Sequence, residues 1–505
     1  MGVPSYIGTI NALYIFRMKT KIITLLLTIS ILLFLPTFGR SEDGNILRYE
    51  QKLLSLINQA RENPLDMAAS LGMDPNRILS DLPDLYDMLT QGLPPLINNT
   101  DLYAVAAAHT MDMLENNYYS HDSPGGSTFD DRIAGSGYVP MVTGEYIEFI
   151  AFGNFIDPEE AIGIIFENMF RNELDPSNTE RRNILAPEFQ EIGIGLGSGS
   201  FKIGGSSYNV YMATCDFAAS YVSALELELL ELMNQARENP LAVAESLGMD
   251  PDQILKDLPD LAQVLIDGLP PLTFNENLYA SAGDHARDML ENGYFSYNSP
   301  DGRTFDDRIR ETGYIPYITG ETKWLLSTVD FKDPAEGALR YFKEIFEHEL
   351  HPGCTDRNIF NPEMKEVGIS FIAMEPSIQG DESGIAYSEY YNPYYSLMMV
   401  CDFGSPLSRD LPHLKGRVFS DLDGDGFYGF GEGEAGFLVT IEGSDNTYYC
   451  FTNRAGGFDI PLEPGLYRIY VSTDEGITEL WSELTDENTA VEFRFDIVPD
   501  ISYIQ

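Results

Sequence analysis

Apolar positions in the first part of the chain recur every three or four residues, a spacing that is typical of amphipathic helices. Asn63 and Pro64 are a suitable N-cap and first residue for a helix that Gly72 would end. The same spacing predicts helices from about Asp101 to Asn116 and from Asp157 to about Glu173.

Further along, the spacing of the apolar positions changes to two, which is typical of half-buried strands. Residues 191–196 and 208–217 alternate in this way and are expected to pair as a hairpin. Helices that pack against an antiparallel sheet place this part of the chain in the α+β class.

Almost all of this pattern occurs twice. Residues 53–217 return as residues 229–403, with a constant shift of 176 for more than a hundred positions. Of the 44 positions from 53 to 96, 31 are identical in the second copy. A repeat of this length is a duplicated domain and not a solenoid unit. We therefore expect one domain at residues 50–220 and a second at 221–406.

Residues 413–505 have a different pattern. Short alternating runs lie between turns rich in Gly, Asp and Asn, and they predict an all-β sandwich of about 90 residues. The expected strands are 416–420, 436–441, 448–452, 457–460, 465–471 and 491–497.

The first 41 residues have the features of a secretory signal. Lys19 and Lys21 precede an apolar run at 22–35, which is short for a membrane span and suits the core of a signal peptide. Met18 is an alternative start, and an uncleaved anchor is the alternative to removal. We expect a secreted, extracellular protein with no stable membrane span after processing.

Charge and cysteine content narrow the possible partners. The formal net charge of −48 repels nucleic acid and anionic membranes, so we expect no nucleic-acid partner. An acidic, solvated surface is the simplest interpretation of this charge.

Cys215 and Cys401 lie in equivalent Cys-Asp-Phe segments, and we expect them to be buried free thiols.

A twelve-residue segment in the C-terminal region, 421–432, has the spacing of a calcium-binding loop. Three carboxylates at alternate positions, a glycine for the sharp turn, a backbone carbonyl and a closing glutamate are provided by Asp421, Asp423, Asp425, Gly426, Phe427 and Glu432. No amphipathic helices flank the segment, so it is not an EF-hand pair. The alternative is an acidic, solvated turn without a cation.

Four segments occur in the same order in both copies of the duplication. In the first copy they are Asn58-Gln59-Ala60-Arg61, Tyr118-Tyr119-Ser120-His121-Asp122-Ser123-Pro124, Gly144-Glu145, and Arg182-Asn183-Ile184-Leu185 continuing to Glu191-Ile192-Gly193-Ile194-Gly195. Together they resemble the CAP superfamily of cysteine-rich secretory, antigen 5 and pathogenesis-related 1 proteins. The resemblance implies an α-β-α sandwich with a central cavity, usually lined by two His and two Glu that can hold a divalent metal.

The resemblance also implies the cavity residues, position by position. In the first repeat the matches are His121, Glu145, either Glu167 or Glu173, and Glu180 where the second histidine should stand. In the second repeat they are Tyr297, Glu321, Lys343 and, across a one-residue deletion, Thr355. Imidazole nitrogen makes such a site select zinc. We therefore expect at most weak zinc binding in the first repeat and none in the second.

Structural roles compete with these assignments. His109 and its counterpart His285 lie at helical spacing on an apolar face, which favours buried structural histidines over ligands. Glu145 and Glu321 are equally suited to bind neighbouring backbone amides. No Gly-x-Ser-x-Gly, His-Glu-x-x-His or phosphate-binding glycine loop is present.

The C-terminal region resembles the calcium-binding B-type repeats of bacterial surface proteins. The likeness lies in the opening Gly416-Arg417-Val418-Phe419-Ser420 that leads into the loop, and in the strand entry Pro464-Gly465-Leu466-Tyr467. We interpret the chain as a secreted bacterial binding or surface-interaction protein with an unknown extracellular ligand or surface as partner. The alternatives are a metal- or carboxylate-dependent hydrolase in the first repeat, and binding of a lipid or other small apolar molecule.

Overall fold

The computed structural model describes residues 43–153, 156–178, 182–328, 334–374, 395–407, 411–444, 446–473 and 476–495. The expected secretory signal at 1–41 and the cavity residue Glu180 lie outside these ranges. No helix within them is both long enough and apolar enough to span a membrane.

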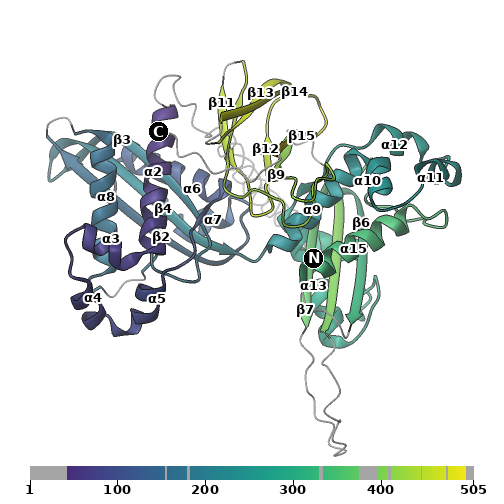
Figure 1. Cartoon of the computed structure of the whole chain (residues 1–505), viewed down its shortest axis with the longest axis horizontal. Coiled ribbons are helices and arrows are strands. Elements are labelled where there is room, and N and C mark those ends of the chain that lie inside the picture. The colour runs from purple at the N-terminus through teal and green to yellow at the C-terminus, as the bar shows by residue number, and fades with distance from the viewer. Residues whose placement is uncertain are drawn as a thin grey trace, which may run out of the picture.

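The first repeat is a four-stranded sheet with helices on both faces (Figure 1). Its helices are α2 (Asp43–Glu62), α3 (Pro64–Ser70), α4 (Pro75–Asp81), the 3₁₀ turn η1 (Pro83–Leu85), α5 (Tyr86–Gln91), α6 (Thr100–Asn116), α7 (Phe129–Ala134) and α8 (Pro158–Glu173). Its strands are β1 (Ile97–Asn98), β2 (Pro140–Phe152), β3 (Glu191–Ile203) and β4 (Ser206–Ser220), in the order β1-β3-β4-β2. The predicted α+β class is confirmed.

Apolar side chains alternate between the two faces of the sheet, which explains why helices cover both faces. Ile194 and Cys215 belong to the core formed with α2 and α8, whereas Met212 packs with α6 on the opposite face. Helix α6 lies so close to β3 that a Cβ added to Gly193 would sit 2.0 Å from the backbone carbon of Leu102. The glycines of the predicted strand at 191–196 therefore allow a helix to approach the sheet.

The second repeat has the same plan. Its helices are α9 (Ala224–Glu238), α10 (Pro240–Ser246), α11 (Pro251–Asp257), α12 (Ala262–Asp267), α13 (Glu276–Asn292), α14 (Phe305–Glu311) and α15 (Pro334–Glu349). Its strands are β5 (Thr273–Phe274), β6 (Pro316–Thr328), β7 (Glu366–Met374) and β8 (Tyr395–Pro406), in the order β5-β7-β8-β6. The duplication in the sequence is therefore a duplication of topology.

Helix ends follow the sequence with one difference. Asn63 occupies the N-cap position before Pro64, as predicted, but its side chain makes no capping hydrogen bond. Helix α6 does have a side-chain cap, because the side chain of Asn99 accepts hydrogen bonds from the backbone N–H groups of Asp101 and Leu102. All four cysteines are buried and free, which includes the predicted thiols of Cys215 and Cys401.

The C-terminal region folds into two packed sheets. The strands are β9 (His413–Ser420), β10 (Leu438–Glu442), β11 (Thr447–Phe451), β12 (Gly457–Pro461), β13 (Gly465–Thr473), β14 (Gly476–Leu484) and β15 (Thr489–Phe495). They form the sheets β11-β10-β13-β14 and β12-β9-β15 around one shared core. Strand β14 was not predicted, because its Ile477 and Trp481 are exposed and its apolar positions mark no buried face.

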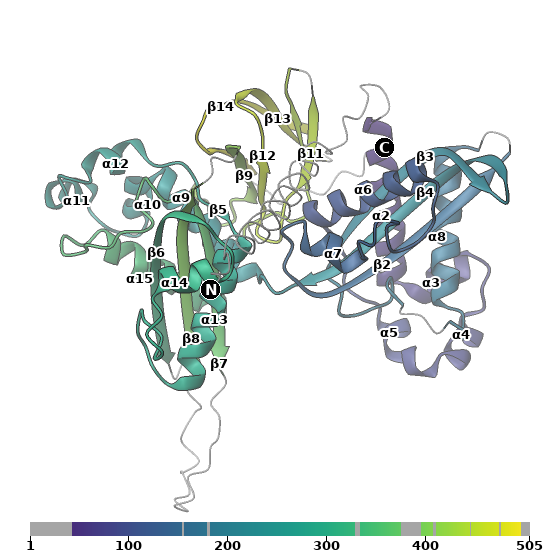
Figure 2. The same cartoon turned by 180° about the vertical axis from the view of Figure 1, so that it is seen from behind.

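The two-sheet C-terminal region lies between the repeats and contacts both (Figures 1 and 2). On the first repeat, the Thr100 hydroxyl donates to the Phe451 carbonyl at 3.2 Å and accepts from its N–H at 2.9 Å. On the second, Arg417 donates to Glu238 at 2.6 Å, and the Tyr428 N–H donates to Gln235 at 2.6 Å. Polar contacts thus link all three parts of the chain.

Candidate functional site

Glu145 is the centre of a buried polar cluster in the first repeat. It lies on β2, and only 2% of its side chain is exposed. One of its carboxylate oxygens lies 2.6 Å from Nδ1 of His121, and the other accepts a hydrogen bond from the guanidinium of Arg132 on α7. Arg132 also donates to the backbone carbonyl of His121 at 2.8 Å. The structure therefore brings together two of the predicted cavity residues, and adds an arginine.

His109 completes the inner side of this cluster. Its Nε2 lies 3.0 Å from the Ser120 carbonyl and 4.0 Å from the Glu145 carboxylate. The side chain is fully buried, and burial together with Arg132 lowers the pKa of the imidazole. His109 is thus a neutral, hydrogen-bonded core histidine that holds the His121 loop, as its helical spacing indicated.

Asp216 lies directly opposite Glu145 on the neighbouring strand β4. Burial raises the pKa of Asp216 well above its usual value, and the Glu145 carboxylate beside it raises that pKa further. Two carboxyl groups in a water-poor interior do not both ionise readily, so the proximity of Glu145 favours the protonated form of Asp216.

The second repeat keeps this cluster almost unchanged. Glu321 is fully buried, accepts a hydrogen bond from Arg308, and has its Oε1 3.7 Å from Nε2 of His285. Asp402 faces it across the strand pair. Burial raises the pKa of Glu321 to about 7, and burial with Arg308 nearby lowers the pKa of His285 to about 4. The buried part of the cluster is therefore common to both repeats.

The repeats differ at the exposed edge of the cluster. The His121 side chain is 57% exposed, and its counterpart Tyr297 stacks under the ammonium of Lys323, which lies 3.4 Å from the ring centroid. Lys323 also lies 4.3 Å from the ring centroid of Phe295. Burial lowers the pKa of the Lys323 ammonium. A cation of the protein itself thus lies against the residue that replaces His121.

The two alternatives for the second cavity glutamate, Glu167 and Glu173, do not join the cluster. Glu167 pairs with Arg171 one turn along α8 at 2.7 Å and is partly exposed. Glu173, its alternative, is buried and accepts the backbone N–H groups of Ile184 and Leu185 at 2.7 and 2.9 Å. The structural role that we considered for Glu145, binding of backbone amides, is therefore filled by Glu173, whereas the Glu145 carboxylate binds Arg132 and His121.

The family's metal positions, as far as the structure describes them, do not fit a metal. In the first repeat, Arg132 already neutralises the buried carboxylate of Glu145, which contacts His121. In the second, Arg308 pairs with Glu321, which is the acidic residue among the four family positions of this repeat. Among the described residues, neither cluster has three His, Cys, Asp or Glu ligand atoms close enough to share an ion.

The predicted calcium loop is a compact turn between β9 and β10. Oxygens of Asp421, Asp423 and Glu432 lie within 4.8 Å of one another, which is the juxtaposition that the loop pattern predicts. Asp425 stands outside this group, and its carboxylate accepts the N–H of Phe427 at 2.8 Å. Gly426 has a φ of 86°, the left-handed conformation expected at the sixth position of such a loop.

Glu432 ties the ends of this loop together. Its two carboxylate oxygens accept the N–H groups of Leu422 at 2.8 Å and of Gly429 at 2.6 Å. Partial burial raises the pKa of this carboxyl group. The guanidinium of Arg494 lies 4.0 Å from the Asp421 carboxylate and donates to the Gly426 carbonyl. Three acidic groups therefore converge here beside Arg494, which offsets part of their charge.

Arg132, Arg308, Asp216 and Asp402 were missed by reasoning from the sequence. A signal was present, because each arginine keeps its place at the shift of 176, and each aspartate follows an equivalent buried cysteine. Retention in both copies marked these residues as parts of one cluster, but only the strand register places Asp216 opposite Glu145.

A family model and solved structures of known proteins match parts of the chain. The family model for the cysteine-rich secretory protein family, CAP, matches residues 54–217 and 230–376. An extracellular protein with an SCP domain from Bacillus anthracis is 23% identical, with a TM-score of 0.19. That match covers 29% of this chain and 44% of the other, so it spans less than half of the Bacillus anthracis chain. An outer surface protein from Borrelia burgdorferi is 17% identical over 29% of this chain and 91% of its own, with a TM-score of 0.18. No curated protein sequence matches the chain.

Proposed function

The chain belongs to the cysteine-rich secretory protein family and carries that family's domain twice, and from this premise we propose that it is an exported binding protein that acts outside the cell without catalysing hydrolysis. Its partner is an extracellular ligand or surface, and its C-terminal β-sandwich is stabilised by calcium. Lys19, Lys21 and the apolar run at 22–35 support export.

The observation that carries the proposal is the arginine on each buried glutamate. Arg132 binds Glu145, and Arg308 binds Glu321, so neither carboxylate is available to a metal or as a base. A catalytic carboxylate needs access to substrate and a pKa matched to its task. The Glu321 side chain is fully buried, the Glu145 side chain is almost fully buried, and each is paired with its arginine. Both clusters therefore serve to hold the His121 and Tyr297 loops against the sheet.

Binding is also consistent with where the two repeats have diverged. The buried partners are retained, whereas the exposed His121 is replaced by the half-exposed Tyr297. Loops on a rigid scaffold commonly carry binding residues, and such positions vary more freely than the core. With a net charge of −48, we expect neutral or cationic partners.

One observation favours hydrolysis in the first repeat as a second candidate. The His121 imidazole is exposed and is hydrogen-bonded through Nδ1 to a buried carboxylate, an arrangement that can orient a general base. Binding of a small apolar ligand has less support. The hollow of about 440 Å³ on the first repeat is edged by Asp84, Asp87 and Glu188 and does not include His121 or Glu145.

The test uses the full-length mature chain and its His121→Tyr variant, which carries the residue that the second repeat already has at this position. Both proteins are incubated with peptide, ester and glycan substrates. We expect no turnover above buffer from either protein. Turnover by the wild type that is lost in His121→Tyr would establish the hydrolase alternative and overturn the proposal.

A parallel measurement addresses the ligand. Native mass spectrometry of the chain purified without detergent is expected to show no bound lipid. A stoichiometric apolar molecule, released by organic extraction, would show instead that the protein is a carrier. Retention on immobilised nucleic acid at physiological ionic strength would contradict the charge argument.

A further inference from the structure

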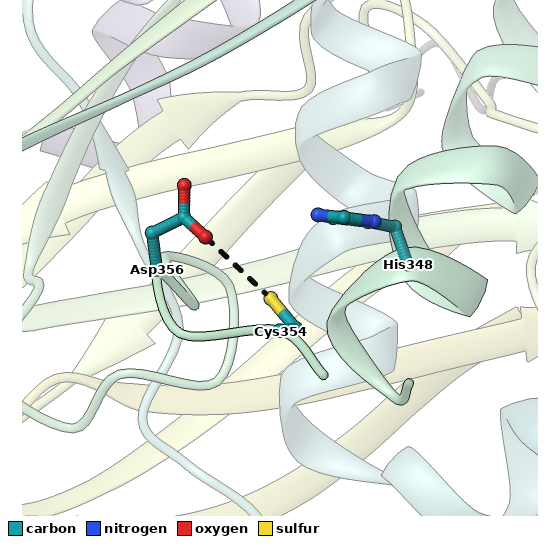
Figure 3. A group of neighbouring side chains, drawn as sticks. All are labelled: His348, Cys354 and Asp356. Carbon is teal, nitrogen blue, oxygen red and sulfur yellow. Dashed lines mark hydrogen bonds between the residues drawn. The ribbon is translucent and has the colours of Figure 1, made fainter. Parts of the chain in front are cut away.

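Three potential metal ligands of different chemistry meet at the end of α15 in the second repeat. Figure 3 shows the imidazole of His348, the thiol of Cys354 and the carboxylate of Asp356 turned toward a common space. One ligand atom from each lies within 4.8 Å of the other two, and the Cys354 sulfur is 3.9 Å from the nearer Asp356 oxygen. Nitrogen, sulfur and oxygen donors are therefore gathered at one point.

The turn that carries Cys354 is held in shape by its own hydrogen bonds. The Cys354 N–H donates to the His351 carbonyl at 3.0 Å. Arg357 donates to the backbone carbonyls of Glu349 at 2.7 Å, His351 at 2.9 Å and Cys354 at 2.5 Å. The ring of Trp324 lies edge-on to that of His348, with centroids 6.1 Å apart. The three ligand side chains thus project from a preorganised backbone.

His348 and Cys354 occupy none of the four cavity positions, which in this repeat are Tyr297, Glu321, Lys343 and Thr355, whereas Asp356 adjoins Thr355 and stands at the shift of 176 from Glu180. The imidazole and the thiol have no counterpart in the first repeat. There, Asn172 stands in place of His348 and Asn178 in place of Cys354, and Asn178 donates to the Asn172 carbonyl at 3.1 Å. We propose that His348, Cys354 and Asp356 form a zinc-binding site that is particular to the second repeat.

The donor set selects the class of metal. Thiolate and imidazole favour a borderline-soft ion such as Zn²⁺ over Ca²⁺ or Mg²⁺, which take oxygen ligands. Bonds of about 2.0–2.3 Å place tetrahedral ligand atoms about 3.3–3.7 Å apart, so separations of up to 4.8 Å close by about 1 Å on binding. His348 lies on the surface and can make that movement by side-chain rotation.

Charge around the site is compatible with a divalent cation. A thiolate and a carboxylate balance the two charges of zinc, and the imidazole binds as the neutral form. Asp356 acts electrostatically on both Lys323 and Tyr297, which places the site beside the lysine–aromatic stack described above. Three protein ligands leave a fourth position for water or for a donor group of a partner. A zinc site here departs from the expectation, drawn from the four cavity positions, that the second repeat binds no zinc.

The test uses the full-length chain, stripped of metal with a chelator and returned to excess calcium so that the oxygen-only loop at 421–432 is saturated. Zinc binding is measured by calorimetry, and cobalt(II) is added as a spectroscopic probe. We expect one zinc site, and a thiolate-to-cobalt charge-transfer band in the near ultraviolet.

Two variants copy the first repeat, His348→Asn and Cys354→Asn, so each introduces a residue that the fold already accepts. Loss of an outer-shell partner lowers metal affinity by about 10–100-fold, and loss of either direct ligand should lower it by at least as much. Cys354→Asn should also abolish the cobalt charge-transfer band. His351→Asn, in the same turn but outside the ligand set, serves as the control and should bind zinc as the wild type does.

Two outcomes would overturn the proposal. Zinc affinity that is equal in the wild type, His348→Asn and Cys354→Asn would place the bound ion elsewhere. A wild-type cobalt spectrum without a thiolate band would exclude Cys354 as a ligand even if one of the variants failed to fold.

Discussion

Arg132 donates a hydrogen bond to the carboxylate of Glu145, and this contact removes from the first repeat the acidic ligand that a family-type metal site would need. The contact joins α7 to β2, and Arg308 and Glu321 repeat it between α14 and β6. Each pair is buried beside a second carboxyl group. In each repeat the arginine–glutamate pair therefore joins a short helix to the central sheet beside the buried acidic residues.

Replacing Arg308 by Met should destabilise the second repeat strongly. Removal of one partner from a buried ion pair typically costs about 3–5 kcal/mol, because the other charge is left without compensation. The cost should be smaller at pH 5 than at pH 8, since Glu321, whose pKa is already about 7, is then protonated. Thermal unfolding at both pH values measures the effect. Arg310→Met removes an exposed pair with Asp306 on the same helix and should change stability by about 0.5 kcal/mol or less; equal losses in the two variants would contradict the prediction.

Calcium should stabilise the C-terminal β-sandwich within the full-length chain. A ligand that binds only the folded state adds about 2.7 kcal/mol at a hundredfold excess over its Kd. Differential scanning calorimetry with and without calcium should show this gain, and Asp423→Asn or Glu432→Gln should reduce it. Glu463→Gln makes the same change of charge outside the loop and should leave the gain intact. A melting temperature that does not respond to millimolar calcium would mean that the loop is only a turn.

Arg417→Met should uncouple the sandwich from the second repeat. The buried guanidinium of Arg417 donates to Glu238 at 2.6 Å and to the partly exposed Glu492 at 2.9 Å, and it lies 3.9 Å from the buried carboxylate of Glu231. Its removal leaves Glu231 and Glu238 without this cation between the two parts. We expect a loss of about 3–5 kcal/mol and separate unfolding transitions. Limited proteolysis and calorimetry report both effects. Arg468→Met, an arginine of the sandwich paired with Glu442 and Glu479, is the control and should preserve the coupling.

Glu50 should make the first repeat less stable as the pH rises. Burial raises the pKa of this side chain to about 8, whereas its ordinary value is 4.5. Between these values the folded state holds a proton that the unfolded state has released, so stability is full below pH 4.5 and falls as the pH rises toward 8. Glu50→Gln should remove this pH dependence of the unfolding free energy, which is at most about 1.4 kcal/mol per pKa unit. The glutamine side chain can still accept the N–H of Leu196.

Denaturant unfolding from pH 4.5 to 8 tests this prediction. Glu62→Gln, an exposed position at the end of the same helix, is the control and should leave the slope unchanged. If Glu50→Gln retains the wild-type dependence on pH, the carboxyl group of Glu50 is ionised in the folded protein.

Several features were determined by the sequence alone, because they depend on neighbours along the chain. The period of the apolar residues located α8 at Pro158–Glu173 and the paired strands β3 and β4. The duplication was visible as a constant shift in numbering. The candidate calcium loop could be proposed for the same reason, since all of its candidate ligands lie within twelve consecutive residues.

Tertiary structure decided which polar side chains meet. Arg132 and Asp216 reach Glu145 from a helix and from a neighbouring strand, and only the strand register places Asp216 opposite it. His348, Cys354 and Asp356 are near in sequence, but their spacing follows no common ligand pattern until the turn clamped by Arg357 aligns them. Periodicity records which face of an element is buried, whereas the chemistry of a site depends on distances between elements, and those distances are set only when the faces pack together.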